Sequence, residues 1–352
     1  TLFPYTTLFR SMKKSLMTLG VLALFVLMAY GQEKKFALYS VAFYNMENLF
    51  DTIHDEGKND YEYLPNGTNQ WNTMKYKAKL KNMSEILSML STDKLPMGPA
   101  IIGVSEIENY RVLEDILKQP ALADRGYQYV HYEGADQRGV DCAFFYNPKL
   151  FELTNSKLVP YVYINDTVHK TRGFLIASGN IAGEKMHFIV NHWPSRAAAS
   201  PARERAGEQV RAIKDSLLRE DSAAKIVIMG DMNDDPMDKS MAVALGAKRK
   251  PADVGPTDLY NPWWDTLKKG YGTLMYKGKW NLFDQIVFTG NLLGTDRSTL
   301  KFYKHEIFRR DFMFQKEGKY KGYPKRTQAG GVWLNGYSDH LPTIIYLIKE
   351  VK

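Results

Sequence analysis

Six short polar clusters carry the residues of this 352-residue chain that could do chemistry together, and each lies beside an apolar run. Their side chains are carboxylates, amides and two imidazoles, with no cysteine and no obvious serine nucleophile among them. Carboxylate and amide oxygens suit a hard divalent cation, and the whole set suits metal-assisted hydrolysis of phosphate esters. The clusters span residues 43–48, 103–106, 190–193, 228–233, 282–286 and 338–342.

Apolar strands are expected to position these clusters, because a polar side chain at a strand end points into the edge of a sheet. Runs rich in β-branched and aromatic residues predict strands at 37–44, 100–104, 127–131, 140–146, 174–178, 185–191, 225–229, 285–289 and 343–348. Helical spacing predicts helices at 73–90, 111–118 and 201–218, and segments rich in Gly, Pro, Asn and Trp predict long loops at 48–72, 234–280 and 309–337. Strands and helices do not alternate strictly, so the pattern favours paired sheets with outer helices over a doubly wound sheet.

The first residues are expected to fall outside the functional chain. Residues 1–11 match the translation of a common short-read sequencing adapter, so we expect the natural chain to begin at Met12. Two lysines then precede an apolar run at 16–28, and small residues stand before Gln32. This pattern is typical of a secretory signal peptide that is cleaved before Gln32. A membrane anchor is the alternative, and the run is short of the ~20 apolar residues that a membrane span needs.

We therefore expect a signal peptide at 12–31, followed by a single catalytic domain at 32–352 that is periplasmic or secreted. Cys142, the one cysteine in the sequence, lies far from the apolar run and within another apolar segment, so neither lipid attachment nor an internal disulfide is expected. No stable membrane insertion is expected after cleavage, and the mature protein is expected to be a monomer.

The charge of the chain fits an anionic substrate without proving one. The formal net charge is +8, and it falls to +5 without residues 1–31, which carry Arg10, Lys13 and Lys14 but no acidic residue. Basic residues gather at 75–81, 248–250, 301–310 and 316–326. Each cluster is open to two interpretations, solvated surface or a binding face.

Taken in order, the six clusters resemble those of the endonuclease/exonuclease/phosphatase superfamily, over the chain from about residue 37 to its C-terminus. The resemblance implies an α/β fold, a four-layer sandwich of two packed mixed β-sheets flanked by outer helices. It implies that Glu106, with Asn45 and Asp339, holds Mg²⁺ or Mn²⁺, with Ca²⁺ as a further candidate. Ser105 stands where the family usually has Gln, but the acid is present. Glu108 and Glu47 are weaker candidates.

The resemblance also implies the catalytic residues. Asp231 orients or deprotonates the attacking water, and Asn233 binds the phosphate. His192 donates to the scissile phosphate or to the leaving oxygen. Asp284 pairs with His340 and fixes its tautomer, as carboxylates do for catalytic imidazoles. Either Asp231 or His340 could be the base.

A carboxylate that follows an earlier strand orients the histidine in DNase-like relatives, and Glu133 is the best match for it here. Asp136 is the second match. Arg138 lies in the same loop and could reach phosphate, because a guanidinium forms charge-assisted hydrogen bonds with phosphate oxygens. His192 and Arg138 are thus expected to bind the phosphate together with Asn233.

These residues predict an exported, divalent-metal-dependent phosphodiesterase, DNase-like, that hydrolyses nucleic acid by in-line attack of water. Trp263, Trp264 and Trp333 could stack on bases, or could simply pack their loops. The alternative is a lipid head-group or small-molecule phosphodiesterase or phosphatase of the same superfamily. An exposed apolar hairpin would favour a lipid substrate, and the segment 312–314 is a weak candidate for one.

Overall fold

The computed structural model describes residues 34–163 and 170–351. The compact unit that carries all six clusters covers Leu38–Lys349. The predicted leader at 12–31 lies outside the described residues and stays a prediction. Among those described, no helix combines the length and the apolar character that crossing a membrane requires.

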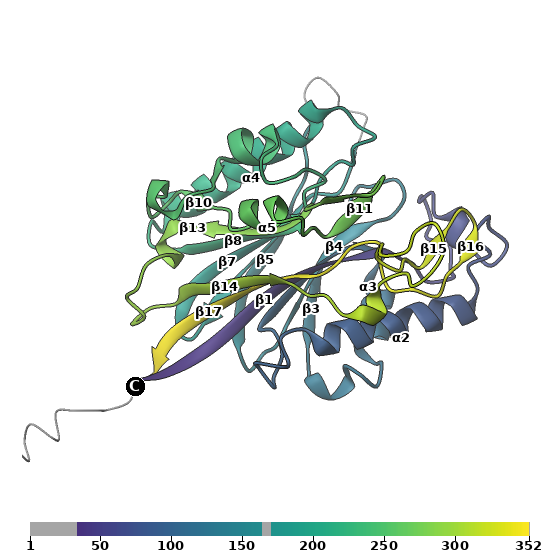
Figure 1. Cartoon of the computed structure of the whole chain (residues 1–352), viewed down its shortest axis with the longest axis horizontal. Coiled ribbons are helices and arrows are strands. Elements are labelled where there is room, and N and C mark those ends of the chain that lie inside the picture. The colour runs from purple at the N-terminus through teal and green to yellow at the C-terminus, as the bar shows by residue number, and fades with distance from the viewer. Residues whose placement is uncertain (1–33, 164–169, 352) are drawn as a thin grey trace, which may run out of the picture. The chain divides into compact units, whose positions relative to one another are not determined.

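The first large sheet has six strands (Figure 1). Its central pair is parallel, with Val41 beside Ile101 and Asn45 beside Ser105, so both strands end at the same sheet edge. In spatial order the strands are β14 (Lys301–Ile307), β17 (Thr343–Val351), β1 (Lys35–Leu49), β2 (Ile101–Ile107), β4 (Asp141–Tyr146) and β3 (Gln128–His131).

The second large sheet has seven strands and is also mixed. The parallel pair β7–β8 ends with His192 beside Asp231, and β13 runs antiparallel to β8 so that Asp284 also lies beside Asp231. In spatial order the strands are β5 (Phe151–Val159), β6 (Phe174–Ile181), β7 (Glu184–His192), β8 (Lys225–Asp231), β13 (Asp284–Thr289), β10 (Leu259–Tyr260) and β9 (Ala247–Lys248).

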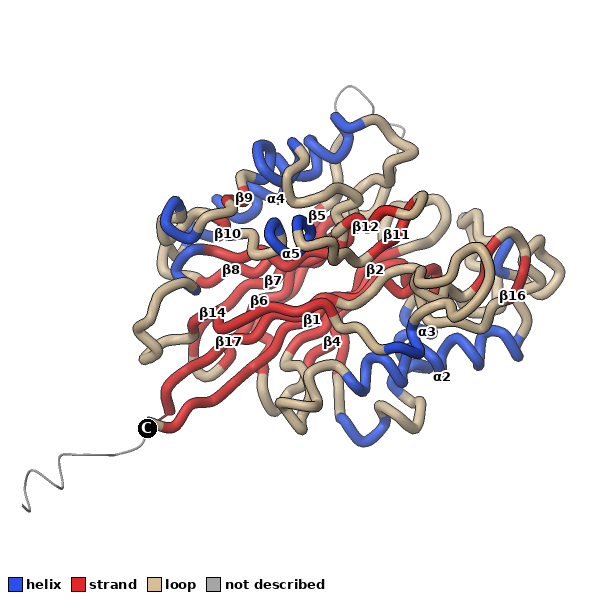
Figure 2. The backbone as a smooth tube through the Cα atoms, in the orientation of Figure 1, coloured by secondary structure: helices blue, strands red, loops and turns tan. Residues whose placement is uncertain are grey.

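The longer helices lie on the outer faces of the two sheets (Figure 2). Helices α2 (Thr73–Met89) and α3 (Tyr110–Leu117) pack on the first sheet, and α4 (Ser200–Glu220) packs on the second. A third apolar cluster, which includes Phe144 and Phe188, fills the space between the sheets. Three apolar interfaces join four layers, so the predicted fold class, an α/β four-layer sandwich, is confirmed. Cys142, which lies within an apolar segment of the sequence, has its side chain buried between the sheets.

Short elements complete the chain. Two small hairpins pair β11 (Leu274–Tyr276) with β12 (Lys279–Asn281), and β15 (Gln328–Ala329) with β16 (Val332–Trp333). Within residues 34–163 and 170–351, the remaining elements are α5 (Trp264–Lys268), a π-helical turn at Ser240–Leu245 and five 3₁₀ turns, at Tyr61–Tyr63, Ala123–Arg125, Pro251–Asp253, Gly290–Leu292 and Asp311–Met313. The long loop predicted at 234–280 is interrupted by several short strands and helical turns.

Trp263 accounts for much of the difference between the predicted loop at 234–280 and the folded segment. Its side chain is fully buried, and its indole nitrogen donates to the carbonyl of Ile286 at 2.9 Å. A tryptophan in a Gly- and Pro-rich segment here anchors the loop to the second sheet, so it cannot stack on bases. Trp333 is partly buried, and its ring packs edge-on against Trp71 at 5.8 Å between centroids.

His305 on β14 gives a stability prediction. Its Nε2 lies 2.9 Å from the hydroxyl of Thr266, and burial, with a smaller effect of Lys269, lowers the pKa of this imidazole to about 4. The unfolded chain takes up the proton near pH 6.5, whereas the folded chain resists it until about pH 4. The free energy of unfolding should therefore fall as the pH drops through this window, by up to about 3 kcal/mol.

Urea unfolding at pH 7.5 and pH 4.5 checks this prediction. A His305→Gln variant keeps a hydrogen-bonding side chain but cannot titrate, so it should lose distinctly less stability than the wild type between these pH values. The same loss in both proteins would show that other groups dominate the acid sensitivity.

Candidate active site

An amide side chain from one sheet joins carboxylates from both sheets. The Nδ2 of Asn45 donates to Glu106 Oε1 and to Asp231 Oδ2, each at 3.0 Å. Asn45 lies on β1 opposite Ser105 of β2, Glu106 lies near the end of β2, and Asp231 ends β8. The Oδ1 of Asn45 accepts the backbone N–H of Glu47 at 2.8 Å, which fixes the amide. The parallel pairs β1–β2 and β7–β8 thus deliver three predicted residues to one point.

Local backbone geometry aims these side chains. Glu106 has φ of 58° and stands where the pairing of β2 with β4 shifts register between Ser105 and Ile107. A bulge of this kind turns a side chain away from the strict alternation of a strand. Asn48 (φ 52°) and Asn233 (φ 52°) are two further positive-φ residues beside the same carboxylates. Strained backbone conformations of this sort tend to gather at functional sites.

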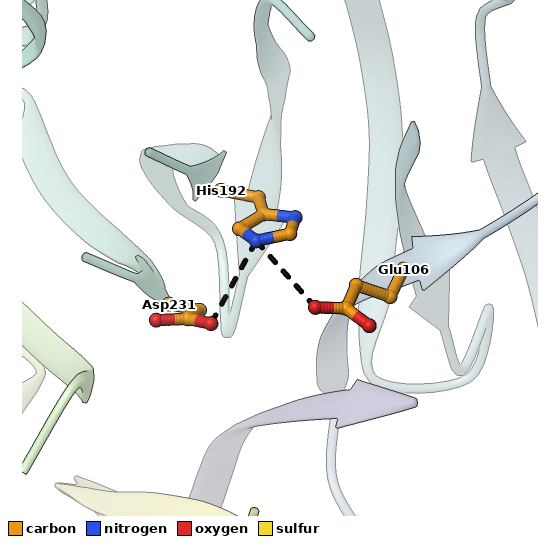
Figure 3. A group of neighbouring side chains, drawn as sticks. All are labelled: Glu106, His192 and Asp231. Carbon is orange, nitrogen blue, oxygen red and sulfur yellow. Dashed lines mark ion pairs between the residues drawn. The ribbon is translucent and has the colours of Figure 1, made fainter. Parts of the chain in front are cut away.

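His192 lies between the two carboxylates (Figure 3). Its Nε2 is 3.6 Å from Glu106 Oε1 and 3.7 Å from Asp231 Oδ2. Burial, helped by the nearby cations Arg172 and Arg138, lowers the pKa of His192 well below its usual value. The imidazole is therefore neutral near pH 7, with one N–H to donate and one nitrogen lone pair. Its Nδ1 is buried and has no hydrogen-bond partner within the described residues.

Asp284 and His340 form the predicted pair. The Nδ1 of His340 lies 2.7 Å from Asp284 Oδ2, and the carboxylate is fully buried. The other ring nitrogen, Nε2, is 3.9 Å from Asp231 Oδ2. Burial opposes a charged imidazole here, but the carboxylates of Asp284 and Asp231 outweigh it and raise the pKa of His340 well above its usual value.

The side chains of Asn45, His192 and His340 all face the carboxylate of Asp231. Burial raises its pKa to about 7, against the attraction of His340 and with added repulsion from Asp284 and Glu106. Its Oδ1 accepts the backbone N–H of Asn233 at 2.9 Å. A carboxyl group that titrates near neutral pH can take up a proton at physiological pH and release it again.

These residues line one cleft of about 430 Å³. The predicted residues on its wall are Glu106, Arg138, His192, Asp231, Asn233 and His340. The sequence interpretation missed the other residues that share the wall, which are Tyr163, Thr171, Arg172, Pro194 and Ser195.

Arg172 is the most important of the missed residues. Its guanidinium is buried, and it donates to the carbonyls of His192 at 3.0 Å and Trp193 at 2.9 Å. It also pairs with Asp136 Oδ2 at 2.9 Å. A basic residue directly before the apolar strand β6 was the available signal. Arg138 is about half exposed, and its Nε lies 3.6 Å from the same Asp136.

Glu133 does not lie where the sequence interpretation put it. It groups with His131 and Asp141 at the start of β4, and none of these three lines the cleft. The second candidate, Asp136, acts on His192 only through Arg172, which binds the histidine backbone rather than its ring. In the described residues, then, no carboxylate orients the imidazole of His192 from its Nδ1 side.

Asp339 also has a different partner. The Nη2 of Arg326 lies 3.0 Å from Asp339 Oδ2, and the Nε of the same guanidinium donates to Glu47 Oε1 at 2.8 Å. Lys79, which is fully buried, lies 3.9 Å from Glu47. Asp339 remains close to the site, since its Oδ1 is 4.0 Å from His340 Nε2. The metal-binding role of Asp339 stays a prediction.

The donor set fits a divalent cation. Besides the group of His131, Glu133 and Asp141, two groups of described residues at the site have ligand atoms that all lie within 4.8 Å of one another, namely Glu106 with His192 and Asp231, and Asp231 with Asp284 and His340. The first group faces the cleft. It combines two carboxylates with the neutral imidazole of His192, whose Nδ1 has no hydrogen-bond partner within the described residues. Asn45 points its amide hydrogens, not its oxygen, at these carboxylates, so its own role as a ligand stays a prediction.

Solved structures with the same fold share little sequence with this chain. An endonuclease/exonuclease/phosphatase family protein from Bacteroides thetaiotaomicron is 15% identical, with a TM-score of 0.56 over 91% of this chain and 98% of that chain. The mannosyl-6-phosphatase Bt3783 of the same species is 15% identical, with a TM-score of 0.54 over 88% and 99%. TDP2 of D. rerio, complexed with single strand DNA product, is 14% identical, with a TM-score of 0.51 over 88% and 99%.

No curated protein matches the sequence significantly. A family model does match it, over residues 40–349, which is most of the chain and includes every residue described in the cleft. The fold shared with the solved structures, and the cleft at the edges of the two sheets, are consistent with this match. The chain therefore belongs to the endonuclease/exonuclease/phosphatase family, whose members are phosphoesterases.

Proposed function

We propose that this protein is an exported, divalent-metal-dependent phosphodiesterase that cleaves nucleic acid as a DNase-like endonuclease. The observation that carries the proposal is the buried junction of Glu106, His192 and Asp231 with the Asp284–His340 pair, built from the edges of two sheets. Such a site offers anionic oxygens for a cation, a titrating carboxyl group and fixed cations for a phosphate, but no covalent nucleophile.

We propose that the cation is Mg²⁺ or Mn²⁺ and that the carboxylate of Glu106 is the main group that would hold it, while His192 and Asp231 face the same point and act on the phosphate and on the water. Bound there, the cation supplies Lewis acidity at a phosphate oxygen and neutralises charge on the leaving group. Asn45 holds the two carboxylates at a fixed separation through its two amide hydrogens.

Asp231 is the proposed base for the attacking water. His340 is already protonated near pH 7, because its pKa is raised, whereas Asp231 has a pKa of about 7 and can accept the proton. The charged His340 then stabilises ionised Asp231. On the phosphate, the neutral N–H of His192 and the guanidinium of Arg172 stabilise the charge that develops on oxygen.

Nucleic acid is preferred over lipid as the substrate. The segment 312–314 does not present three apolar side chains to solvent, because Met313 is buried and Phe314 packs against Trp280. The half-exposed Arg138 at the cleft suits a chain of phosphates, and the similar TDP2 of D. rerio was solved with single strand DNA product. Small phosphate esters are the alternative, since Bt3783, with a comparable TM-score, is a mannosyl-6-phosphatase.

A salt titration tests this preference. Arg138→Ala should raise KM on single-stranded DNA, and it should reduce the slope of log KM against log salt by about one, since one phosphate contact is lost. Arg219→Ala is the matched control, because Arg219 lies in the last turn of α4, which leads to the start of β8 rather than to its catalytic end. It should keep the wild-type slope.

A substrate panel completes the test, with supercoiled plasmid, single-stranded DNA, sphingomyelin vesicles, mannose 6-phosphate and bis-p-nitrophenyl phosphate assayed side by side. Intact DNA at low salt, alongside brisk hydrolysis of mannose 6-phosphate or sphingomyelin, would replace the nuclease proposal with the alternative.

A further inference from the structure

A second and larger cavity of about 750 Å³ lies beside the active-site cleft. One wall is the β11–β12 hairpin, and the other is the chain between Gln315 and Leu334. Most of its lining is apolar or aromatic, with Tyr276 from the hairpin and Tyr320 and Tyr323 from the opposite wall. Large, mostly apolar cavities with a few polar groups are where proteins bind the apolar parts of ligands.

The two walls are tied together. Tyr276 pairs with Lys279 across a two-residue turn, and both turn residues have positive φ, 47° at Lys277 and 79° at Gly278. This is the turn geometry that matches the twist of a β-hairpin. The backbone N–H of Gly278 then donates to the hydroxyl of Tyr323 at 2.6 Å. The hydrogen bond between Gly278 and Tyr323 therefore joins the two walls of the cavity directly.

The cavity adjoins the catalytic residues. Leu274, the first residue of β11, pairs with His340, and the backbone N–H of Leu341 donates to the carbonyl of Thr273 at 2.9 Å. Asp339 and Arg326 form its floor, and Asp339 precedes the catalytic histidine in sequence. A substrate with its phosphate at His340 would have a neighbouring group within reach of the cavity.

The exposed aromatic rings carry positive charge beside them. Tyr276 is 61% exposed and Tyr320 is 53% exposed, so both rings are accessible to a ligand. The ammonium groups of Lys277 and Lys319 lie 5.3 and 5.6 Å from the centroids of these two rings. The one acidic residue in the lining, Asp339, is paired with Arg326. Flat aromatic faces with adjacent cations are the features that bind bases and their phosphates.

We propose that this cavity binds a nucleobase of the substrate next to the scissile phosphate, by stacking on Tyr276 and Tyr320, while Lys277 and Lys319 contact the backbone. The inference rests on the proposed nuclease function and names its specificity element. It explains why rings that could be buried stand exposed at the rim of a cavity. Stacking on an aromatic side chain contributes about 1–3 kcal/mol per base, which is roughly a five- to 150-fold effect on binding.

The test compares two oligonucleotides with the same number of phosphates, a thymidine 12-mer and the matching abasic backbone. The wild type should show a KM for the thymidine strand at least about tenfold lower than for the abasic strand. The double variant Tyr276→Ala/Tyr320→Ala should bring the ratio of the two KM values close to one. The variant Tyr276→Phe/Tyr320→Phe retains both rings and should retain the wild-type ratio.

Tyr303→Ala is the matched control, because Tyr303 is 50% exposed on β14 and is absent from the cavity lining. It should keep the wild-type ratio. If the wild type cleaves both strands with equal KM, or if the alanine variant keeps the wild-type ratio, the cavity proposal is refuted while the nuclease function stands. If neither strand is cleaved while another ester in the panel is hydrolysed, the nuclease function fails, and the cavity proposal fails with it.

Discussion

Replacing Glu106 with glutamine should lower kcat/KM for phosphodiester hydrolysis by at least about 10³-fold, which corresponds to ~4 kcal/mol of lost transition-state stabilisation. The substitution removes one negative charge from the group of atoms that converges on the cleft. It keeps the shape of the side chain, and glutamine can still accept the backbone N–H of Asn48, which Glu106 Oε2 accepts at 3.0 Å. Folding should therefore survive, with an unfolding midpoint close to that of the wild type.

Glu108→Gln provides a matched control only two residues away. Glu108 lies outside the cleft and accepts the backbone N–H of Asp51 at 2.7 Å. Burial, with repulsion from Asp51, raises the pKa of Glu108 to about 9, so the group is uncharged near pH 7 and glutamine is a close substitute. This variant should keep nearly full activity and an unchanged metal requirement. Equal losses in both variants would mean that charge at Glu106 is not what matters.

Replacing Asp284 with asparagine should lower kcat by about 10³–10⁴-fold, the size of effect seen when a carboxylate that fixes a catalytic imidazole is neutralised. Asp284 is fully buried and bonds His340 Nδ1 at 2.7 Å. An asparagine amide can present its N–H₂ to that nitrogen, which would favour a neutral imidazole without a proton on Nδ1. Loss of the carboxylate also removes a main attraction that raises the pKa of His340.

Two readouts separate this role from a purely structural one. The NMR titration of His340 should move to lower pH in Asp284→Asn, whereas KM for substrate should change little. An unaltered titration curve together with wild-type kcat would contradict the pairing. A loss of folded protein alone, without a shift of the titration in the folded fraction, would assign Asp284 a structural role.

Much of the fold followed from the sequence where strands are central. The strands that were predicted are buried and rich in β-branched or aromatic residues, as in β8, where every residue is buried. Two of the strands that were missed at the sheet edges, β5 and β14, have one neighbour each and alternate partly exposed polar residues with apolar ones. Such an edge strand lacks the continuous apolar run from which a strand is predicted in the sequence.

The site residues divide in the same way into those that the sequence predicted and those that it did not. Asn45, Glu106 and Asp231 stand at the ends of apolar strands, and their convergence follows from parallel pairing at one edge. Arg172 and Arg326 do not stand at the end of an apolar strand, and only the folded chain brings them to their partners Asp136 and Glu47. Glu133 was a misplaced prediction for the same reason. The loop after β3 sends Asp136, not Glu133, toward the cleft, and the contact passes through Arg172.

The most direct measurement is the rate of hydrolysis of single-stranded DNA and bis-p-nitrophenyl phosphate by the wild type and Glu106→Gln, each in Mg²⁺, in Mn²⁺ and in excess EDTA. A divalent-metal-dependent phosphodiesterase centred on Glu106 should hydrolyse both substrates in Mg²⁺ or Mn²⁺. Both activities should be lost in EDTA and return when metal is restored, and the variant should be nearly inactive throughout. Undiminished hydrolysis by the wild type in EDTA, or wild-type rates in Glu106→Gln, would contradict the proposed site.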